Sequence, residues 1–263
     1  MQDTTMAEAD PQNISKSSPF DMTTLREFRP KAEVLERSKI VAFDSRDLRS
    51  RPFNLMRTKF TKQLDAHNLQ MVGITSPAPM AGKSCLSMNL AAALARLDDK
   101  QVVLVDLDLR RGSIADEVGL EFEAGVSDYL AGAVSDLSKI AVRIADYPLA
   151  ILPTAAVSED SSSMLAGKRY DRLIEDLREI ARDAIVLIDL PPVFANDDAM
   201  LTASALDAYL MIVDAGKTTQ RQLKDSIEMM RPTPCAGTVL NRYKGGSIDS
   251  YGYGSKAYSR YYD

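Results

Sequence analysis

Apolar runs of strand length alternate with helix-length segments over most of this chain. Runs such as Val102–Asp106 and Ile185–Asp189 are short and rich in Val, Ile and Leu, which is typical of strands buried on both faces of a sheet. Segments of roughly 10 to 15 residues with helical periodicity separate them. This alternation predicts an α/β fold with a mostly parallel sheet and helices on both faces. The expected strands are Met71–Thr75, Val102–Asp106, Leu149–Leu152, Ile185–Asp189, Tyr209–Val213 and Gly237–Leu240, and the expected helices are Lys31–Lys39, Asn54–Leu64, Lys83–Leu97, Tyr170–Ile180 and Gln220–Met230.

The two ends of the chain differ in composition from this middle part. Residues 1–23 are rich in Ser, Asp, Gln and Asn and are expected to be disordered. Residues 24–240 are expected to form one domain. Beyond them, residues 241–263 contain one sizeable aliphatic residue, Ile248, and six of the ten tyrosines, which Gly and Ser separate. A core cannot form from such a composition, so this segment is predicted to be a flexible tyrosine-rich tail.

The charge of the chain limits what it can bind. The formal net charge is −5, which argues against general nucleic-acid binding, because a surface that follows phosphates is normally basic. One stretch, from Arg46 to Lys62, has six basic residues against one acidic residue. A solvated helix face and a docking surface for a partner both explain this stretch.

The apolar runs and the cysteines of the chain indicate the cellular compartment in which it is expected. No run approaches the roughly 20 apolar residues that cross a bilayer, and residues 1–20 lack the apolar core of a signal peptide. The two cysteines, Cys85 and Cys235, fit a reducing compartment better than a disulfide framework. We therefore expect a cytoplasmic chain that reaches a membrane only through a partner.

A Gly82-Lys83-Ser84 tripeptide follows the first expected strand and opens the next expected helix. Backbone N–H groups at a helix N-terminus bind phosphate oxygens, helped by the positive end of the helix dipole. Lys83 would add a positive charge at the β- and γ-phosphates, and the Ser84 hydroxyl would coordinate Mg²⁺. The full pattern G-x-x-x-x-G-K-[ST] is not met, because Pro77 stands at the first glycine position.

Two aspartates, each closing an apolar strand, support a phosphate site. Asp106 ends Val102–Asp106, and Asp189 ends Ile185–Asp189. Side chains at the carboxyl ends of parallel strands point into the crevice where α/β sheets bind ligands. Asp189 therefore fits a ligand of Mg²⁺ or of its water, and the two aspartates together make a chance occurrence of the tripeptide a weaker explanation.

The segment from Asp106 to Arg111 reads DLDLRR. Alternation along an extended chain places Asp106 and Asp108 on one side. Two carboxylates beside a metal–phosphate centre can divide metal binding from proton acceptance by an attacking hydroxyl. Arg110 and Arg111 would stabilise phosphate charge, pair with a neighbouring subunit or form ordinary surface ion pairs.

Several segments together resemble the bacterial tyrosine kinases of capsule and exopolysaccharide synthesis. These kinases are P-loop proteins of the same broad class as the ParA/MinD-like partitioning and septum-placing ATPases. The resemblance runs from about Asn54 to the C-terminus and includes the tyrosine-rich end. The segments that carry it are Thr75-Ser-Pro-Ala-Pro79, Asp106-Leu-Asp-Leu-Arg-Arg111, Gly125-Val-Ser-Asp-Tyr-Leu-Ala-Gly132, Ile188-Asp-Leu-Pro-Pro-Val193 and Gly237-Thr-Val-Leu-Asn241.

The resemblance implies an ATP and Mg²⁺ site in which Lys83 acts on the phosphates. Asp106 would be the base toward a tyrosine hydroxyl, Asp108 would support the metal, and the Mg²⁺ ligands would be Ser84, Asp106 and Asp189. The residues implied to contact the nucleotide are Ala81, Gly82, Lys83, Ser84, Cys85 and Asn241. The tyrosines implied to accept phosphate, in trans from a neighbouring subunit, are Tyr243, Tyr251, Tyr253, Tyr258, Tyr261 and Tyr262.

The resemblance also implies partners. A membrane-embedded chain-length regulator on a separate polypeptide would activate the kinase at the inner membrane, and the kinase would form a homo-oligomer. Two departures from the family pattern bear on this expectation. The family has Gly-Glu where this chain has Met80-Ala81, and a side chain at Met80 would restrict how closely the backbone approaches a nucleotide. The family's Glu-x-x-Arg-x-x-Arg oligomerisation pattern keeps only Arg57.

Two other functions fit parts of the sequence. A ParA/MinD-like positioning ATPase would carry a signature lysine early in the loop, where this chain has Ala78. A nucleotide-binding scaffold of a polysaccharide export complex would retain the fold without turnover, and Met80 favours it. The DLDLRR segment and the tyrosine tail favour the kinase.

Overall fold

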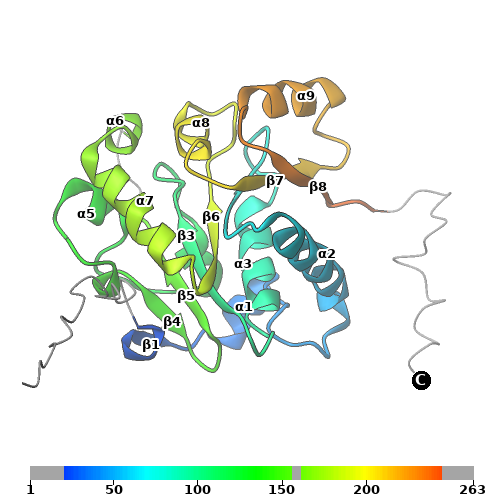
Figure 1. The fold of residues 1–263 in the computed structure, drawn as a ribbon. Coiled ribbons are helices and arrows are strands. Elements are labelled where there is room, and N and C mark those ends of the chain that lie inside the picture. The colour runs from blue at the N-terminus through cyan, green and yellow to red at the C-terminus, as the bar shows by residue number, and fades with distance from the viewer. Residues whose placement is uncertain (1–20, 156–160, 245–263) are drawn as a thin grey trace, which may run out of the picture.

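The computed structural model describes residues 21–155 and 161–244 of the 263-residue chain. An eight-stranded sheet with the strand order β1-β4-β5-β3-β6-β2-β7-β8 runs through its centre (Figure 1). Every neighbouring pair is parallel except β4 with β5. The mostly parallel α/β fold expected from the sequence is therefore confirmed. The strands are β1 (Arg26–Phe28), β2 (Met71–Thr75), β3 (Gln101–Asp106), β4 (Val142–Ile144), β5 (Leu149–Leu152), β6 (Ala184–Asp189), β7 (Ala208–Asp214) and β8 (Cys235–Asn241).

Helices cover both faces of the sheet (Figure 1). One buried cluster includes side chains of α2, α3 and α4, and the other includes side chains of α5, α7 and α8. The helices are α1 (Ala32–Ser38), α2 (Arg51–His67), α3 (Lys83–Leu94), α4 (Ile114–Val118), α5 (Val126–Ala131), α6 (Ser161–Leu165), α7 (Lys168–Ile180), α8 (Asp198–Ala203) and α9 (Gln220–Met229). Short 3-10 turns lie at Met22–Thr24, Leu48–Ser50 and Leu137–Lys139.

Helix α3 begins at Lys83 and is buried along almost its whole length. All its residues except Cys85 are buried, among them the small residues Ala91–Ala93, which let α2 and residues 39–42 approach closely. Asn89 fixes that segment: its Oδ1 accepts from the N–H groups of Val41 (2.9 Å) and Ala42 (3.1 Å), and its Nδ2 donates to the Lys39 carbonyl (3.0 Å). The buried side-chain amide of Asn89 thus attaches residues 39–42 to helix α3.

Six short elements, of three to six residues each, were not expected from the sequence. They are strands β1 and β4 and helices α4, α5, α6 and α8. Hydrophobic periodicity cannot develop over so few residues, because one helical period already takes 3.6. Strand β4 also introduces the antiparallel pair, since Val142 lies opposite Ile151 of β5.

The ends of the packed region differ from the boundaries at 24 and 240. Met22, within the segment expected to be disordered, is buried together with Leu25, because Asp21 caps the turn that carries Met22 into the core. Strand β8 continues through Asn241. Residues 1–20 and 245–263, which contain most of the expected disordered segment and tail, lie outside the described residues.

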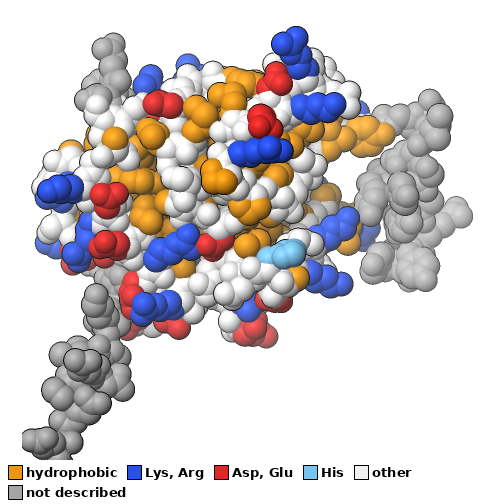
Figure 2. All heavy atoms as spheres, turned by 45° about the horizontal axis from the view of Figure 1, so that its top comes forward, with side chains coloured by type: hydrophobic (Ala, Val, Ile, Leu, Met, Phe, Trp, Pro, Cys, Tyr) orange, Lys and Arg blue, Asp and Glu red, His pale blue; other side chains and the backbone are white. Residues whose placement is uncertain are grey.

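The surface of the molecule carries charges of both signs (Figure 2). Within the part of the chain that the structure describes, none of the helices has the length and apolar character needed to span a bilayer. Figure 2 shows Lys and Arg side chains interspersed with Asp and Glu around a middle region where hydrophobic side chains reach the surface.

Candidate nucleotide site

The expected phosphate loop connects β2 to α3 at the carboxyl edge of the sheet. It is tied to the loop that follows the neighbouring strand β6. The Thr75 hydroxyl donates to the Pro191 carbonyl (2.7 Å), and the N–H of Val193 donates to the Ser76 carbonyl (2.8 Å). These bonds bring the loop beside the end of β6, where Asp189 lies. Asp189 therefore lies beside the loop at the carboxyl edge of the sheet.

Gly82 is the point where this loop enters α3. Its φ of 85° lies in the left-handed region, and a Cβ at this position would lie 2.4 Å from Asn241 Nδ2. Only glycine meets both conditions without displacement. The loop thus needs the second glycine of the usual pattern, Gly82, whereas its first glycine is replaced by Pro77.

Lys83 lies among three buried carboxylates. Its Nζ is 2.9 Å from Asp108 Oδ2 and 3.6 Å from Asp189 Oδ2, and the residue is only 9% exposed. Burial alone would lower the pKa of Lys83, but the charges of Asp189 and Asp108 outweigh burial and raise it. Lys83 is therefore a fixed cation at the point where the sequence predicted a phosphate.

The Asp189 carboxylate accepts hydrogen bonds from two serine hydroxyls of α3. Ser84 Oγ donates to Asp189 Oδ2 (2.6 Å), and Ser87 Oγ donates to Asp189 Oδ1 (2.8 Å). Burial raises the pKa of Asp189, although Lys83 and both hydroxyls act in the opposite direction. Ser87 was not among the expected residues. Its spacing of three from Ser84 on one helix was the available signal, because residues three apart share a helix face.

Asp106 is held by backbone groups of the segment that follows β3. Its Oδ2 accepts from the N–H groups of Ser113 (2.9 Å) and Ile114 (3.0 Å), and its Oδ1 accepts from the N–H of Asp108 (3.2 Å). Burial, followed by the charge of Asp189, raises the pKa of Asp106 to about 7. The carboxylate is thus fixed in direction and titrates near neutral pH.

The donor set fits Mg²⁺ and phosphate. Three buried carboxylates face one lysine, which leaves the cluster with an excess of negative charge that a divalent cation would offset. The Ser84 hydroxyl and the Asp189 carboxylate are adjacent hard oxygen ligands of the kind Mg²⁺ prefers. Within the described residues no group of three or more His, Cys, Asp or Glu side chains forms a closed metal cage. Mg²⁺ commonly binds in this way, with one or two protein ligands plus water and substrate phosphates.

The remaining residues expected to contact nucleotide also lie around the loop. Ala81 is buried, and its carbonyl accepts from Asn241 Nδ2 (2.8 Å), so the Asn241 side chain contacts the loop itself. Cys85 is half-buried, with its Sγ 3.5 Å from the Ser38 carbonyl, and burial raises the pKa of its thiol to about 11. At neutral pH this thiol is protonated and unreactive. Met80 has φ 63° and is 79% exposed, so its side chain points into solvent.

The two arginines of the DLDLRR segment have different surroundings. Arg110 Nε donates to Ser161 Oγ (2.9 Å) and lies 3.8 Å from the buried Asp198. It therefore connects the segment after β3 to α6 and α8. Arg111 is exposed.

Of the six tail tyrosines, Tyr243 is the one within the described residues. It is 58% exposed and follows β8 closely. Tyr251, Tyr253, Tyr258, Tyr261 and Tyr262 lie outside the described residues.

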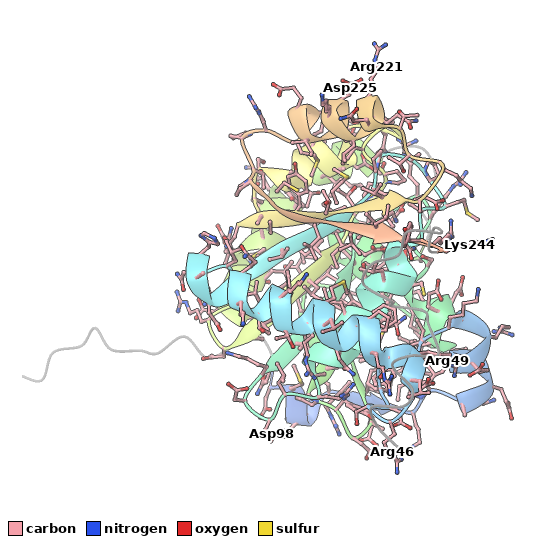
Figure 3. All side chains as sticks on the ribbon, turned by 90° about the vertical axis from the view of Figure 1, so that its right-hand side faces the viewer. Arg46, Arg49, Asp98, Arg221, Asp225 and Lys244 are labelled. Carbon is pink, nitrogen blue, oxygen red and sulfur yellow. The ribbon has the colours of Figure 1, made fainter. Side chains whose placement is uncertain are left out.

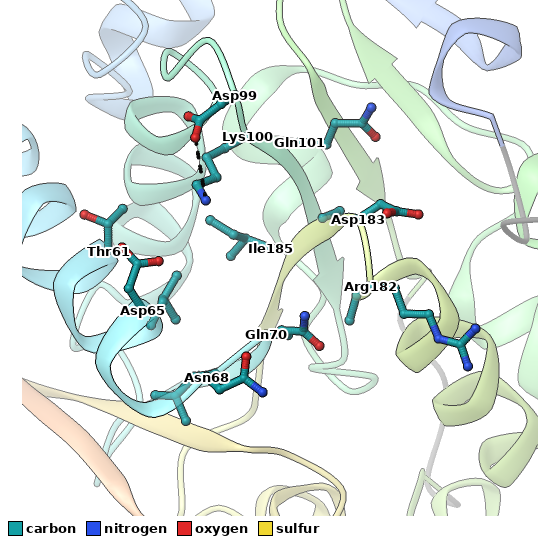
Figure 4. Close-up of a pocket in the computed structure, with 14 residues that line it drawn as sticks. Thr61, Asp65, Asn68, Gln70, Asp99, Lys100, Gln101, Arg182, Asp183 and Ile185 are labelled. Atoms are coloured by element: carbon teal, nitrogen blue, oxygen red, sulfur yellow. Dashed lines mark ion pairs between the residues drawn. The ribbon is translucent and has the colours of Figure 1, made fainter.

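A cavity lies at the opposite edge of the sheet from Lys83. Its volume is about 340 Å³, and residues at the starts of β2, β3 and β6 line it (Figure 4). Asp99 and Lys100 form an ion pair of 3.8 Å there. None of the residues expected to bind nucleotide borders this cavity.

The sheet, the loop that opens α3 and the serine–aspartate pair define a protein of the P-loop class. No family model matches the chain. A putative tyrosine-protein kinase, EpsB, of Ralstonia nicotianae is 32% identical over 205 residues, which cover 77% of this chain and 26% of EpsB. Tyrosine-protein kinase YwqD of Bacillus subtilis is 25% identical over 226 residues, which cover 83% of this chain and 92% of YwqD. The crystal structure of the VpsO kinase domain is similar with a TM-score of 0.65 and 28% identity, covering 74% of this chain and 97% of that one.

These comparisons confirm the predicted resemblance: the homologues of this chain are bacterial tyrosine-protein kinases. The chain spans about a quarter of the length of the first curated relatives that it matches, since 26% of EpsB and 26% of a kinase of Acinetobacter johnsonii are covered.

Proposed function

We propose that this chain is an ATP-dependent protein-tyrosine autokinase that regulates exopolysaccharide or capsule synthesis and export. The observation that carries the proposal is the cluster in which Lys83 and Ser84 face Asp189, with Asp106 at the end of the neighbouring strand β3 and Asp108 just beyond it. Such a cluster combines a cation for phosphate, an oxygen pair for Mg²⁺ and a further carboxylate for proton transfer. The tyrosine-kinase names of the homologues support the same activity.

The residues of the cluster have defined chemical tasks in this proposal, and Asp106 has two of them. Ser84 and Asp189 hold Mg²⁺, with Asp106 close enough through its shared register with Asp189 to complete the shell. Lys83 would exchange Asp108 for a phosphate oxygen when nucleotide binds, because its Nζ lies at the start of α3 and is already paired with that carboxylate at 2.9 Å. Mg²⁺ would supply charge neutralisation for the transferred phosphoryl group.

Proton transfer is assigned to Asp106. A base works best when its pKa lies near the working pH, and burial raises the pKa of Asp106 to about 7. Its three backbone hydrogen bonds leave further lone pairs of the carboxylate able to accept a proton from a tyrosine hydroxyl.

The acceptors and partners follow from the family. We propose that Tyr243, Tyr251, Tyr253, Tyr258, Tyr261 and Tyr262 receive phosphate from a neighbouring subunit of a homo-oligomer. Each phosphate would add about −1.5 to −2 charges, which would drive subunits apart. A membrane-embedded regulator on a separate polypeptide would activate the kinase at the inner membrane. Ala78, at the position of the signature lysine of positioning ATPases, disfavours that alternative.

The proposal is tested by intact-mass spectrometry after expression in a host that lacks related kinases. We expect a ladder of added phosphates on the wild type that maps to Tyr243–Tyr262, and none on Lys83→Met. Lys62→Met, the same substitution at an exposed lysine of α2, is the matched control and should keep the ladder. If the wild type is unmodified, the measurement is repeated with the membrane regulator co-expressed. Absence of phosphotyrosine under both conditions would refute the autokinase.

A further inference from the structure

Two successive residues at the end of β8 bind two successive carbonyls of the phosphate loop. Asn241 Nδ2 donates to the Ala81 carbonyl (2.8 Å), and Arg242 Nη1 donates to the Met80 carbonyl (2.5 Å). The Asn241 Oδ1 also accepts from the N–H of Arg242 (2.9 Å), which holds the two side chains in register. The segment after β8 is therefore attached to the loop at both Met80 and Ala81.

The direction of these carbonyls decides the direction of the next N–H groups. A trans peptide is planar, so the C=O of one residue and the N–H of the following residue point in opposite directions. When the carbonyls of Met80 and Ala81 are turned toward β8, the N–H groups of Ala81 and Gly82 are turned away from it. Phosphate loops bind their anion through such successive backbone N–H groups.

Arg242 is itself held by a buried carboxylate. The same Nη1 donates to Asp214 Oδ2 (2.8 Å), at the end of β7, and Asp214 is only 5% exposed. Lys217 Nζ lies 3.4 Å from the same oxygen, and the other oxygen, Asp214 Oδ1, has no hydrogen-bond partner within the described part of the chain. A buried carboxylate strongly favours retention of its cation. The guanidinium is therefore fixed between β7 and the loop.

The loop of this chain needs such a fixed contact. Pro77 replaces the first glycine of the usual pattern, and Met80 adopts a φ of 63°. A left-handed conformation is unfavourable for a residue other than glycine. The Met80 side chain is 79% exposed and contributes little packing that would offset this cost. The bond from Arg242 to the Met80 carbonyl favours the observed conformation.

We propose that Arg242, held by Asp214, is a positioning residue that keeps the phosphate loop in its phosphate-binding shape. The inference rests on the nucleotide site of the proposed function and adds to it a residue outside the nucleotide-binding motifs. Arg242 acts through the Met80 carbonyl and not by contact with the reacting phosphate.

Binding of two ligands to the full-length protein tests this role. Isothermal calorimetry would measure Mg²⁺-dependent binding of ATP and of inorganic triphosphate to the wild type and to Arg242→Ala, Arg242→Lys and Asp214→Asn. For Arg242→Ala we expect about a tenfold loss of affinity for both ligands, since the charge-assisted hydrogen bond to the Met80 carbonyl is removed. Arg242→Lys should recover part of the loss, because one Nη1 makes both contacts and one ammonium group can do the same.

A matched surface arginine controls for the loss of charge. Arg221 of α9 has a 91% exposed side chain and an ion pair of 3.6 Å to Asp225. Figure 3 shows both residues on the outer side of α9, pointing into solvent and far from Lys244, which marks where the chain leaves β8. Arg221→Ala should bind both ligands like the wild type. Thermal melting without ligand would show that each variant is folded at the assay temperature.

The possible results separate three explanations. An unchanged affinity of Arg242→Ala for triphosphate with weakened ATP binding would mean that Arg242 acts on the nucleoside, and would overturn the positioning role. Unchanged binding of both ligands would overturn it as well. Failure of the wild type to bind either ligand would overturn the nucleotide site itself. Because binding is measured without tyrosine phosphorylation, an idle kinase does not affect the result.

Discussion

Aspartates at the two edges of the sheet both accept backbone N–H groups, yet their surroundings differ. At the amino edge, Asp207 accepts from the N–H groups of Gln70 and Met71 (both 2.8 Å) and pairs with Arg178. Burial raises the pKa of Asp207, but these partners together outweigh burial and lower it. At the carboxyl edge, Asp106 accepts three N–H groups, but burial and Asp189 raise its pKa to about 7.

The difference comes from the balance of charge. Asp207 is half-buried with an arginine of its own, so its charge is compensated and contributes to stability. Asp106, Asp108 and Asp189 share Lys83 in a buried site, so part of their charge is uncompensated until a cation binds. The amino edge is thus arranged for stability, and the carboxyl edge is arranged to bind a ligand at the expense of stability in its absence.

The largest expected effect comes from Asp189→Asn at the carboxyl edge. Loss of the proposed Mg²⁺ ligand should reduce phosphotyrosine formation at least about 100-fold, in the range of other electrostatic catalytic groups. The free energy of unfolding of the nucleotide-free protein should rise by about 1 kcal/mol, because one uncompensated buried charge is removed. Quantitative phosphotyrosine analysis and urea unfolding measure the two effects. A less stable variant would contradict the assignment of the carboxyl edge as a strained site.

Asp207→Ala is the opposite change at the amino edge. It removes two N–H acceptors and the partner of Arg178, so we expect the free energy of unfolding to fall by about 2 kcal/mol. Affinity for ATP should stay within about twofold of the wild type, because the mutation leaves the phosphate loop unchanged. Urea unfolding and calorimetric titration check both statements. A tenfold loss of ATP affinity would show that the two edges are coupled.

The sequence predicted those parts of the molecule whose signal is local. All six expected strands form, because runs such as Val102–Asp106 can be buried only in the centre of a sheet. The same reasoning placed Lys83, Ser84, Asp106 and Asp189 at one edge, since strand ends of parallel neighbours meet there.

The missed parts depend on distant partners. Strand β1 has three residues, two of them charged, and is defined by its pairing with β4. Arg242 contacts Met80 and Asp214 across 162 and 28 residues of sequence, so no motif relates the three residues. The family resemblance indicated Asn241 but not the arginine beside it. Backbone–side-chain contacts of this kind become visible only in three dimensions.

The raised pKa of Asp106 predicts a pH dependence of stability. Its pKa moves from an ordinary value of 3.8 to about 7, so the native state binds more protons than the unfolded state between these values. The free energy of unfolding should therefore fall as pH rises through this window. The charges that act on Asp106 are those of Asp189, which raises its pKa, and Lys83, which lowers it.

The test compares urea unfolding of the wild type and Asp189→Asn from about pH 5 to pH 8, without Mg²⁺ or nucleotide. Removal of the Asp189 charge lowers the pKa of Asp106, so the decline with pH should be smaller in the variant. Equal slopes in the two proteins would show that the pH dependence has another source, and the proposed contrast between the two edges would lose its electrostatic basis.

The smallest expected effect tests whether backbone conformation adds to the strain of the carboxyl edge. Met80→Gly removes the cost of a left-handed conformation at a residue other than glycine, which is about 1 kcal/mol. The glycine also makes the unfolded chain more flexible, which lowers the free energy of unfolding by about 0.4 to 1 kcal/mol. The free energy of unfolding should thus change by less than about 0.5 kcal/mol. The Met80 carbonyl remains available to Arg242, so ATP affinity should also be nearly unchanged. If Met80→Gly instead bound ATP much more tightly, the Met80 side chain would be limiting approach of the nucleotide. The strain at this edge would then be steric as well as electrostatic.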